Sequence, residues 1–496
     1  MTILVCLAFD VGTTGVKAAL VSQAGEVIAS ATREYPTETA DGGVVEQDAN
    51  LWWQAAAAAA TEITAGHAVS AIVVTGQMQD LILIDGEGMP LRPVILYSDT
   101  RARAEADTVA ARLGAHRLTQ LTGNEQGASG LLAKLRWLHV HEPATLAKAR
   151  HLLLGAADWL VLRTTGIAAT DTTTASTTGL MELATRRWLI LQRGAHISDN
   201  LALAVGANIA LLLPKLVNGG ARVGTLTVAA ADALGVAAGI PVHLAPGDAG
   251  AATLGASAGE SGISYAYIGT SGWVAYTSEQ RGDPARGVFT LAHPDPARYI
   301  CVAPLLTAGG NLDWVQSVFG AESHDALIEN AIEGSPGAKL VYLPYLNGER
   351  SPFSDPQASG AFIGLRAHHT QADMARAVLE GVAFAYRHAL EALMPTPVAR
   401  LMMAGGGTRS LAWCQLFADV IGVVLDVAAD AQNVGVRGAV LAAQVARGEQ
   451  ASYAPAGVVP VRATLTPNAE MRAHYDHLFS IYKAAYPALQ DVLQRL

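Results

Sequence analysis

Two short turns of nearly the same composition occur in the two halves of this chain. They read Gly12-Thr13-Thr14-Gly15 and Gly269-Thr270-Ser271-Gly272. The apolar runs that flank them are Leu4 to Phe9 and Val16 to Val21 in the first half, and Ile263 to Ile268 and Trp273 to Tyr276 in the second. Each turn therefore predicts the tip of a β-hairpin. Because glycine lets the backbone approach a ligand and clustered N–H groups with hydroxyls suit phosphate oxygens, the pair indicates a duplicated phosphate cradle.

The length and composition of the chain are those of a folded protein with two large domains. It has 496 residues, of which 51% are hydrophobic and 15% charged, and a single core rarely grows to that size. The most membrane-like stretch, Leu201 to Leu213, is short for a bilayer span and is interrupted by Gly206 and Asn208. No transmembrane helix is expected. Met1 leads directly into a strand-like run, so no secretory signal is expected either.

The net charge limits the kinds of binding partner to expect, and the cysteines indicate the cellular compartment. The net charge is -10 and no basic run is present, which argues against nucleic acid or an anionic membrane as the main partner. Cys6, Cys301 and Cys414 lie far apart in apolar surroundings, a pattern typical of reduced buried thiols in a cytoplasmic protein. The 14 histidines are scattered without a convincing ligand set, so a zinc site is not expected.

Strand and helix signals alternate in both halves, which predicts an α/β protein with mixed sheets. Besides the two hairpins, strands are predicted at residues 27–34, 70–75, 81–84, 94–97, 242–245 and 401–404. Helices are predicted at residues 51–63, 101–112, 131–139, 309–319, 371–393, 410–421 and 434–446, the first of them with Asp48 as its N-cap. The halves are expected to meet at Pro246-Gly247, which gives domains 1–246 and 247–496.

Two aspartates follow predicted strands at places where ligands bind. Asp10 directly precedes the first turn, where it either holds a phosphate-bound Mg²⁺ through water or caps the turn by side-chain to backbone bonds. Asp248 follows Pro246-Gly247, and ligands of open α/β sheets bind outside the carboxyl ends of strands and between domains. Asp248 is therefore well placed for chemistry.

Three further segments carry both a ligand-binding and a purely structural interpretation. Gly405-Gly406-Gly407 lies between a strand and a helix, and it either admits adenine or a phosphate or only packs tightly. Gly76-Gln77-Met78-Gln79-Asp80 offers amides and a carboxylate for a polyhydroxylated ligand, although an ordinary polar loop has the same composition. Asp99 is either a ligand contact or the N-cap of the following helix. Neither a Walker A sequence nor a G-x-G-x-x-G after the first strand is present, which counts against those nucleotide-binding classes.

Taken together, these segments resemble the FGGY family of carbohydrate kinases, and most closely its xylulokinases. The matching pieces run in the family's order from Phe9 to about Ala443, which is nearly the whole chain. The pieces are Asp10 to Lys17, Glu46 to Gln54, Gly76 to Met78, Pro246 to Asp248, Gly269 to Gly272, Leu343 to Pro352, Glu380 to Val382 and Gly405 to Gly407. The run from Leu343 to Pro352 is the most distinctive of them.

The resemblance implies two actin-like (ribonuclease H-like) domains, the first holding the sugar and the second ATP, which meet in a cleft. It implies that Asp248 is the general base and that Asp10 positions Mg²⁺ while D-xylulose is phosphorylated to D-xylulose 5-phosphate. The implied sugar-binding residues are Gln77, Met78, Gln79, Asp80 and Asp99. The implied ATP-binding residues are Gly12, Thr13, Thr14, Lys17, Gly269, Thr270, Ser271, Gly309, Gly310, Gly405, Gly406, Gly407 and Ser410. A homodimer also fits the resemblance.

The chain departs from the family pattern mainly at the sugar end. Met78-Gln79-Asp80 stands where xylulokinases usually read Met-His-Gly, and Tyr97-Ser98-Asp99 where they usually read Trp-Asn-Asp. Arg437 occupies a position that is usually small and apolar. The alternatives are therefore a kinase for ribulose, another ketopentose or a polyol, an actin-like or Hsp70-like ATPase, and a catalytically silent sugar-binding regulator.

Overall fold

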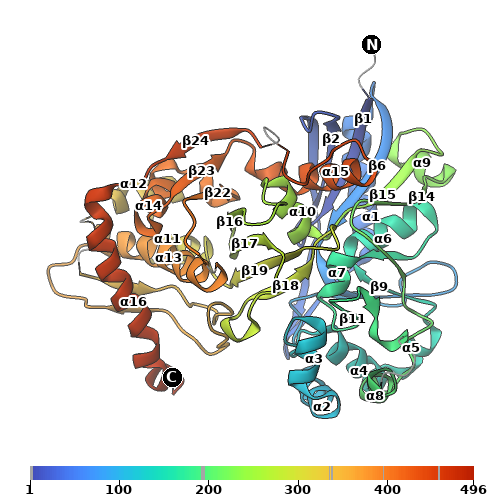
Figure 1. The fold of residues 1–496 in the computed structure, drawn as a ribbon, viewed down its shortest axis with the longest axis horizontal. Coiled ribbons are helices and arrows are strands. Elements are labelled where there is room, and N and C mark those ends of the chain that lie inside the picture. The colour runs from blue at the N-terminus through green and yellow to red at the C-terminus, as the bar shows by residue number, and fades with distance from the viewer. Residues whose placement is uncertain are drawn as a thin grey trace.

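The chain folds into two lobes, each built around one mixed sheet (Figure 1). The computed structural model describes residues 4–191, 196–334, 336, 339–394, 396–455 and 459–495. In Figure 1 the first half of the chain, blue to green, forms the lobe on the right, and most of the second half, yellow to red, forms the lobe on the left.

The first sheet has six strands in the order β14-β15-β6-β1-β2-β3. Their bounds are β14 Ala221–Thr225, β15 Pro241–Leu244, β6 Ala68–Gly76, β1 Leu4–Val11, β2 Gly15–Ser22 and β3 Val27–Glu34. The strands β1, β2 and β3 are antiparallel, whereas β6 and β15 run parallel to β1. The first predicted hairpin, β1 to β2, is therefore confirmed.

The second sheet repeats this plan. It has seven strands in the order β18-β19-β17-β16-β22-β23-β24. Their bounds are β18 Phe289–Ala292, β19 Tyr299–Leu305, β17 Gly272–Ser278, β16 Ser264–Ile268, β22 Arg400–Ala404, β23 Val424–Ala428 and β24 Val461–Leu465. The strands β16, β17 and β19 are antiparallel, and β22 and β23 run parallel to β16. Each lobe thus has three antiparallel strands followed by parallel ones, as expected for two actin-like domains.

A smaller sheet with several helices extends the first lobe. Its strands have the order β4-β5-β8-β7-β9, with bounds β4 Glu38–Ala40, β5 Val44–Gln47, β8 Val94–Ile95, β7 Met78–Ile84 and β9 His151–Gly155. The neighbouring helices are α2 Arg103–Leu113, α3 Ala115–Thr122, α4 Leu131–His141, α5 Pro143–Lys148, α6 Ala156–Thr165, α7 Thr172–Ser176 and α8 His196–Val205. This extension places β7, which continues from β6, at the edge of the space between the lobes.

Two helices from the second half of the sequence pack on the first sheet. These are α10 (Asp248–Gly255) and α15 (Val434–Ala446), which follow the equivalent strands β15 and β23. Apolar residues of both helices share one core with β1, β2 and β6. A Cβ on Gly438 would lie 1.8 Å from the Ala251 oxygen, so the helices touch backbone to backbone. The described structure therefore joins the lobes through this helix pair (Figure 1).

Most predicted elements are present, with changes at their ends. Asp48 caps α1 (Ala49–Thr64) as predicted. The helix expected at 101–112 begins at Arg103, and the strand expected at 94–97 covers only Val94–Ile95. The long helices α11 (Gly310–Phe319), α13 (Gln371–Leu393) and α14 (Leu411–Ile421) lie close to their predicted ranges. The strands β18 and β19 and the last helix, α16 (Arg472–Leu493), were not predicted from the sequence.

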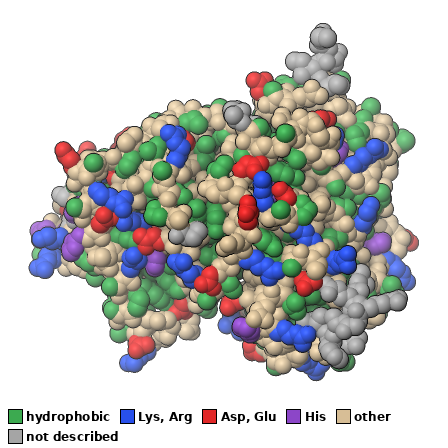
Figure 2. Space-filling view, in the orientation of Figure 1, with side chains coloured by type: hydrophobic (Ala, Val, Ile, Leu, Met, Phe, Trp, Pro, Cys, Tyr) green, Lys and Arg blue, Asp and Glu red, His purple; other side chains and the backbone are tan. Residues whose placement is uncertain are grey.

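The surface shown in Figure 2 has mixed charge. Lys and Arg side chains are interspersed with Asp and Glu across both lobes. On this face, the described residues form no extended basic track of the kind that follows a nucleic-acid backbone. Among the helices of the described ranges, none is long and apolar enough to cross a membrane.

Candidate active site

The first glycine turn directs its carbonyl oxygens into the protein. The Gly12 oxygen accepts from the Tyr35 hydroxyl, and the Thr14 oxygen accepts from the Tyr35 N–H at 3.3 Å. The Thr13 oxygen accepts from Nε2 of Gln47 at 2.6 Å. Because a carbonyl and the N–H of the next residue point in opposite directions within one peptide plane, the N–H groups of Thr13 and Thr14 point away from these partners. That arrangement suits an anionic ligand.

The second turn has the same arrangement with different partners. The Gly269 oxygen accepts from the Gly309 N–H at 2.8 Å, and the Thr270 oxygen accepts from the Gly310 N–H at 2.9 Å. A Cβ on Gly309 would lie 2.5 Å from the Gly269 oxygen, so only glycine fits there. The structure thus places Gly309 and Gly310 directly behind the turn, and the Thr270 and Ser271 N–H groups point the other way.

The three-glycine segment lies against the strand that leads into the second turn. Gly405 has a φ of 98°, and a Cβ on it would lie 2.4 Å from the Ile268 oxygen. Gly407 is equally close to the Ile268 side chain, whereas nothing lies within 4 Å of a Cβ on Gly406. Ser410 accepts from the Trp413 N–H and so caps α14. The segment therefore leaves an open surface at Gly406 beside the second turn.

Asp10 lies at the end of β1 between three elements. It is opposite Lys17 of β2 in the hairpin register and beside Thr75 of β6. A Cβ on Gly435, in the first turn of α15, would lie 2.2 Å from Oδ2 of Asp10. Burial raises the pKa of Asp10, and the neighbouring Lys17 opposes that shift. Lys17 also donates to the Gln432 oxygen, which links β2 to the segment before α15.

Asp248 is the first residue of α10, and its Oδ1 accepts from the Ala249 N–H at 2.7 Å. Its pKa is raised to about 7, first by burial and then by the negative charges of Asp10 and Asp171. The two predicted aspartates therefore lie near enough to interact. A carboxyl with a pKa near neutrality can accept a proton at physiological pH.

Asp171 is a residue of this site that the sequence analysis missed. It is fully buried and caps α7, accepting from the Thr173 N–H at 2.7 Å and the Thr174 N–H at 3.1 Å. It also accepts a backbone hydrogen bond from Gly247, directly before Asp248. The signal was an Asp followed by three hydroxyl residues, which is a typical N-cap pattern.

Gln77 and Met78 contact the first turn and the segment before Asp248, respectively. The Thr13 hydroxyl donates to Oε1 of Gln77 at 2.9 Å, and Nε2 of Gln77 lies 3.3 Å from Oε1 of Gln47. Because Gln77 is 1% exposed and accepts from Thr13, it supports the first turn from within the protein. Met78 is half-buried and packs against Gly247, where a Cβ would lie 2.3 Å from its sulfur.

Gln79 lines the cavity between the lobes. Its φ is 65°, a conformation that non-glycine residues seldom adopt, and it falls where the pairing of β7 with β9 shifts register. The bulge turns Gln79 toward a cavity of about 460 Å³, which Thr100 of the first lobe and Glu349 and Arg350 of the second also line. This cavity has the size of a small-ligand site and lies between the lobes.

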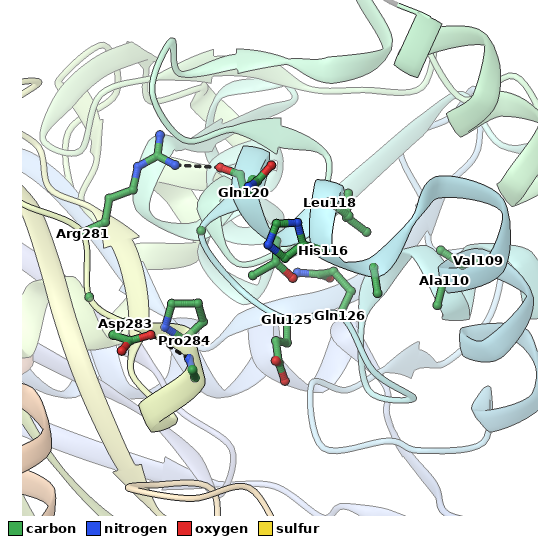
Figure 3. Close-up of a pocket in the computed structure, with 15 residues that line it drawn as sticks. Val109, Ala110, His116, Leu118, Gln120, Glu125, Gln126, Arg281, Asp283 and Pro284 are labelled. Carbon is green, nitrogen blue, oxygen red and sulfur yellow. Dashed lines mark hydrogen bonds between the residues drawn. The ribbon is translucent and has the colours of Figure 1, made fainter.

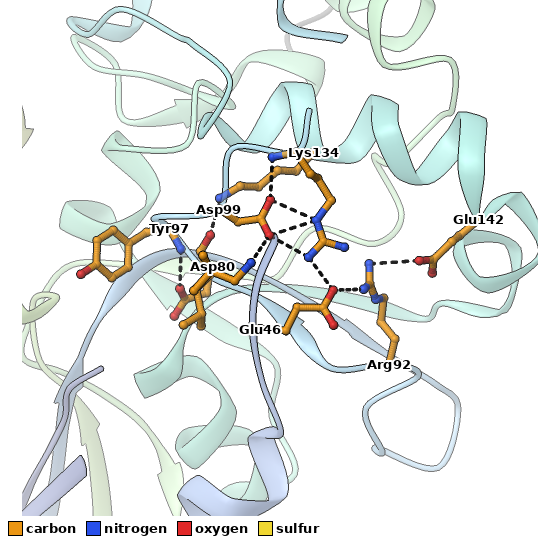
Figure 4. A network of polar contacts seen from close by, with 10 residues as sticks. Glu46, Asp80, Arg92, Tyr97, Asp99, Lys134 and Glu142 are labelled. Atoms are coloured by element: carbon orange, nitrogen blue, oxygen red, sulfur yellow. Dashed lines mark hydrogen bonds and ion pairs between the residues drawn. The ribbon is translucent and has the colours of Figure 1, made fainter. Parts of the chain in front are cut away.

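Asp80 is fully buried and does not line this cavity. Figure 4 shows its polar contacts. Its Oδ1 accepts from the Tyr97 N–H at 3.1 Å, and its Oδ2 has no hydrogen-bond partner among the described residues. Burial raises its pKa, which the charge of the buried Lys134 opposes. Lys134 donates to the Leu96 oxygen at 2.6 Å, which is the carbonyl directly before Tyr97. Asp80 and Lys134 together hold the Tyr97 segment.

Asp99 is also fully buried, and its oxygens accept from the protein (Figure 4). They bind the Val45 N–H at 2.6 Å and the Arg101 guanidinium at 2.7 to 3.0 Å. Arg101 in turn pairs with Glu46 at 2.6 Å, and Glu46 also pairs with Arg92. The network ties β5 to the segment after β8, on the side of Asp80 away from Tyr97 (Figure 4).

A second cavity, of about 750 Å³, lies between α3 and the segment 281–285 of the other lobe (Figure 3). Arg281 donates to the Gln120 oxygen at 2.8 Å across it. The two cavities share Glu125 and Pro284, so they are neighbours along the same gap between the lobes. The cavity of about 460 Å³ is the one lined by Gln79, and the preceding residue, Met78, packs against Gly247 directly before Asp248.

The comparisons with known proteins agree with this geometry. Residues 5–255 match the N-terminal domain of the FGGY family of carbohydrate kinases, and residues 264–447 match its C-terminal domain. A xylulose kinase from Escherichia coli is 31% identical over 98% of this chain and 99% of its own length. The crystal structure of xylulose kinase from Rhodospirillum rubrum superposes with a TM-score of 0.86 at 28% identity, covering 99% of both chains. That of gluconate kinase from Lactobacillus acidophilus has a TM-score of 0.90 at 26% identity, covering 98% of both chains. The chain therefore belongs to the FGGY family of carbohydrate kinases.

Proposed function

We propose that this kinase uses ATP to phosphorylate a primary hydroxyl of a small ketose, with D-xylulose as the preferred substrate and Asp248 as the general base. The observation that carries the proposal is the placement of Asp248 close to Asp10, at the end of the strand that leads into the first N–H turn. The first lobe, residues 1–246, would bind the sugar, and the second, residues 247–496, the adenosine part of ATP.

In the proposed step, the sugar hydroxyl oxygen forms a bond to the γ-phosphorus as the bond from that phosphorus to the β,γ-bridging oxygen breaks. The hydroxyl proton passes to Asp248, and ADP leaves with the electron pair of the broken bond. Such transfer depends mainly on positioning and on stabilising charge. The Thr13 and Thr14 N–H groups on one side and those of Thr270 and Ser271 on the other supply donors for the phosphates.

Mg²⁺ fits the surroundings of Asp10. Burial and the charge of Asp10 raise the pKa of Asp248, and a cation held at Asp10 would lower the free energy of both charged carboxyls. Gly435 leaves the space beside Oδ2 of Asp10 that any side chain would fill. Magnesium prefers oxygen ligands and retains water, so Asp10 would hold it through water. When bound, the ion would neutralise charge on the phosphates.

Chelation of divalent cations is expected to abolish turnover, because the phosphate charge would then lack its counter-ion. Adding excess EDTA in a coupled assay of ADP release should reduce the rate to background. Excess MgCl₂ should restore it. Turnover that persists after exhaustive chelation would contradict a metal-dependent reaction.

The proposal also specifies which sugar the kinase phosphorylates. The curated relative from E. coli is named a xylulose kinase, which supports D-xylulose, whereas the similar structure of a gluconate kinase shows that this fold serves more than one acceptor. Gln79 faces the cavity in this chain, while Asp80 and Asp99 lie behind it. We therefore assign Gln79 to direct sugar contact, and Asp80 and Asp99 to positioning of the Tyr97 segment.

A panel of acceptors tests this assignment. D-xylulose, D-ribulose, D-gluconate and glycerol are assayed separately for ADP release under identical conditions. We expect the highest kcat/KM for D-xylulose. A higher value for D-ribulose or a polyol would keep the kinase chemistry and replace the substrate, and no turnover on any sugar or polyol would refute the proposed activity.

A further inference from the structure

We propose that Tyr267 is a catalytic residue whose phenolic hydroxyl donates a hydrogen bond to the phosphoryl group during transfer. The inference rests on the proposed phosphoryl transfer and adds a donor that the sequence analysis did not single out. Tyr267 lies on β16, two residues before Gly269 of the second turn.

The ring of Tyr267 lies beside the second turn. A Cβ on Gly269 would lie 3.1 Å from Cε1 of Tyr267 and 3.9 Å from its hydroxyl, so the ring borders the second turn. Tyr267, Met78 of the sugar side and Ala249, the residue after Asp248, each pack against the same buried apolar cluster. The strands β16 and β17 accordingly lie next to α10 at the centre of the molecule (Figure 1). The ring therefore borders the second turn and packs on the same apolar cluster as the helix that begins with the general base.

The ring is held rigidly in this place. It stacks on Trp273, its partner across the hairpin, with ring centroids 4.2 Å apart and an angle of 10° between planes. The indole N–H of Trp273 donates to the Tyr265 hydroxyl at 2.7 Å, which fixes the indole. The backbone oxygen of Tyr267 accepts from the Tyr386 hydroxyl at 2.6 Å. A donor that is fixed before the reaction costs little reorganisation when charge develops.

The hydroxyl of Tyr267 is available as a donor. Within the described part of the chain it has no hydrogen-bond partner, whereas the hydroxyl of Tyr265 accepts from both Trp273 and Thr253. The side chain of Tyr267 is half-buried, so a ligand can reach it. Burial and the charges of Asp10 and Asp248 raise its pKa, which keeps the phenol protonated. A protonated phenol facing a transferring phosphoryl group can only donate to its oxygens.

Tyr267→Phe tests the inference, because it keeps the stacked ring and removes only the hydroxyl. We expect kcat to fall by about 10- to 100-fold, the range for loss of one hydrogen bond to a charged group, with KM for sugar and ATP changed less than about twofold. Affinity for ADP with aluminium fluoride and the sugar, a mimic of the transferring group, should fall by a similar factor. Affinity for a non-hydrolysable ATP analogue should stay the same.

The matched control is Tyr276→Phe, at the opposite end of the same hairpin, which should retain wild-type kcat. A Tyr267→Phe enzyme with kcat within about twofold of wild type would overturn the inference. So would a loss that is equal for the ATP analogue and the transition-state mimic, since that result indicates a ground-state or structural role. Wild-type turnover on the sugar panel reports on the proposed function separately, so failure of one is distinguishable from failure of the other.

Discussion

Replacing Asp248 by Asn is expected to reduce kcat by about 10²- to 10⁴-fold, the usual contribution of a general base. Asn has the same shape and can still accept from the Ala249 N–H, which Asp248 does at 2.7 Å, so α10 should begin unchanged. What the variant loses is the capacity to accept the hydroxyl proton. Steady-state kinetics on the best sugar, together with binding of a non-hydrolysable ATP analogue, measure the two consequences separately. Nucleotide binding should stay close to wild type.

The control for this variant is Asp232→Asn, an exposed aspartate on α9 (Val228–Leu234), which should leave kcat unchanged. Retention of more than about a tenth of wild-type kcat in Asp248→Asn would contradict the role of a general base. Loss of turnover in Asp248→Asn would also exclude the silent regulator. A regulator would keep its biological function in this variant, whereas a kinase would lose it.

The sequence predicted the parts of this fold that depend on local signals. Apolar runs around glycine turns gave both hairpins, because a hairpin is specified by residues that are adjacent in the chain. The duplication followed from the similarity of Gly12-Thr13-Thr14-Gly15 and Gly269-Thr270-Ser271-Gly272. The sheet order, with β6 and β22 each parallel to the first strand of its lobe, agrees with that duplication.

The contacts that orient the peptide groups of the first turn and surround Asp10 could not be predicted from local sequence signals. Tyr35 and Gln47 donate hydrogen bonds to the carbonyl oxygens of the first turn, although nothing in their neighbourhood in the sequence indicates a contact with that turn. Gly435 lies against Asp10 across more than four hundred residues. Such contacts depend on how whole elements pack, and tertiary packing has no periodic or local signature.

The packing of α10 against α15 determines where the two aspartates lie relative to each other. Asp248 begins α10, and α15 carries Gly435 against Asp10. The helices approach through glycine on both sides, since a Cβ on Gly255 would lie 1.8 Å from the Val434 oxygen. Backbone oxygens cannot move aside as flexible side chains can. Any Cβ at this contact must therefore separate the helices, and with them the two carboxyls.

Gly438→Ala is accordingly expected to lower the free energy of unfolding by about 2 to 3 kcal/mol, the upper part of the range for overpacking a core, despite the gain of about 1 kcal/mol in helix propensity. The new Cβ would lie 1.8 Å from the Ala251 oxygen. Urea unfolding and kcat should both be affected, because α10 carries the general base. The control is Gly86→Ala, whose Cβ would meet nothing nearer than 3.8 Å. A Gly438→Ala protein with wild-type unfolding and wild-type kcat would show that the helices can separate without consequence for the site.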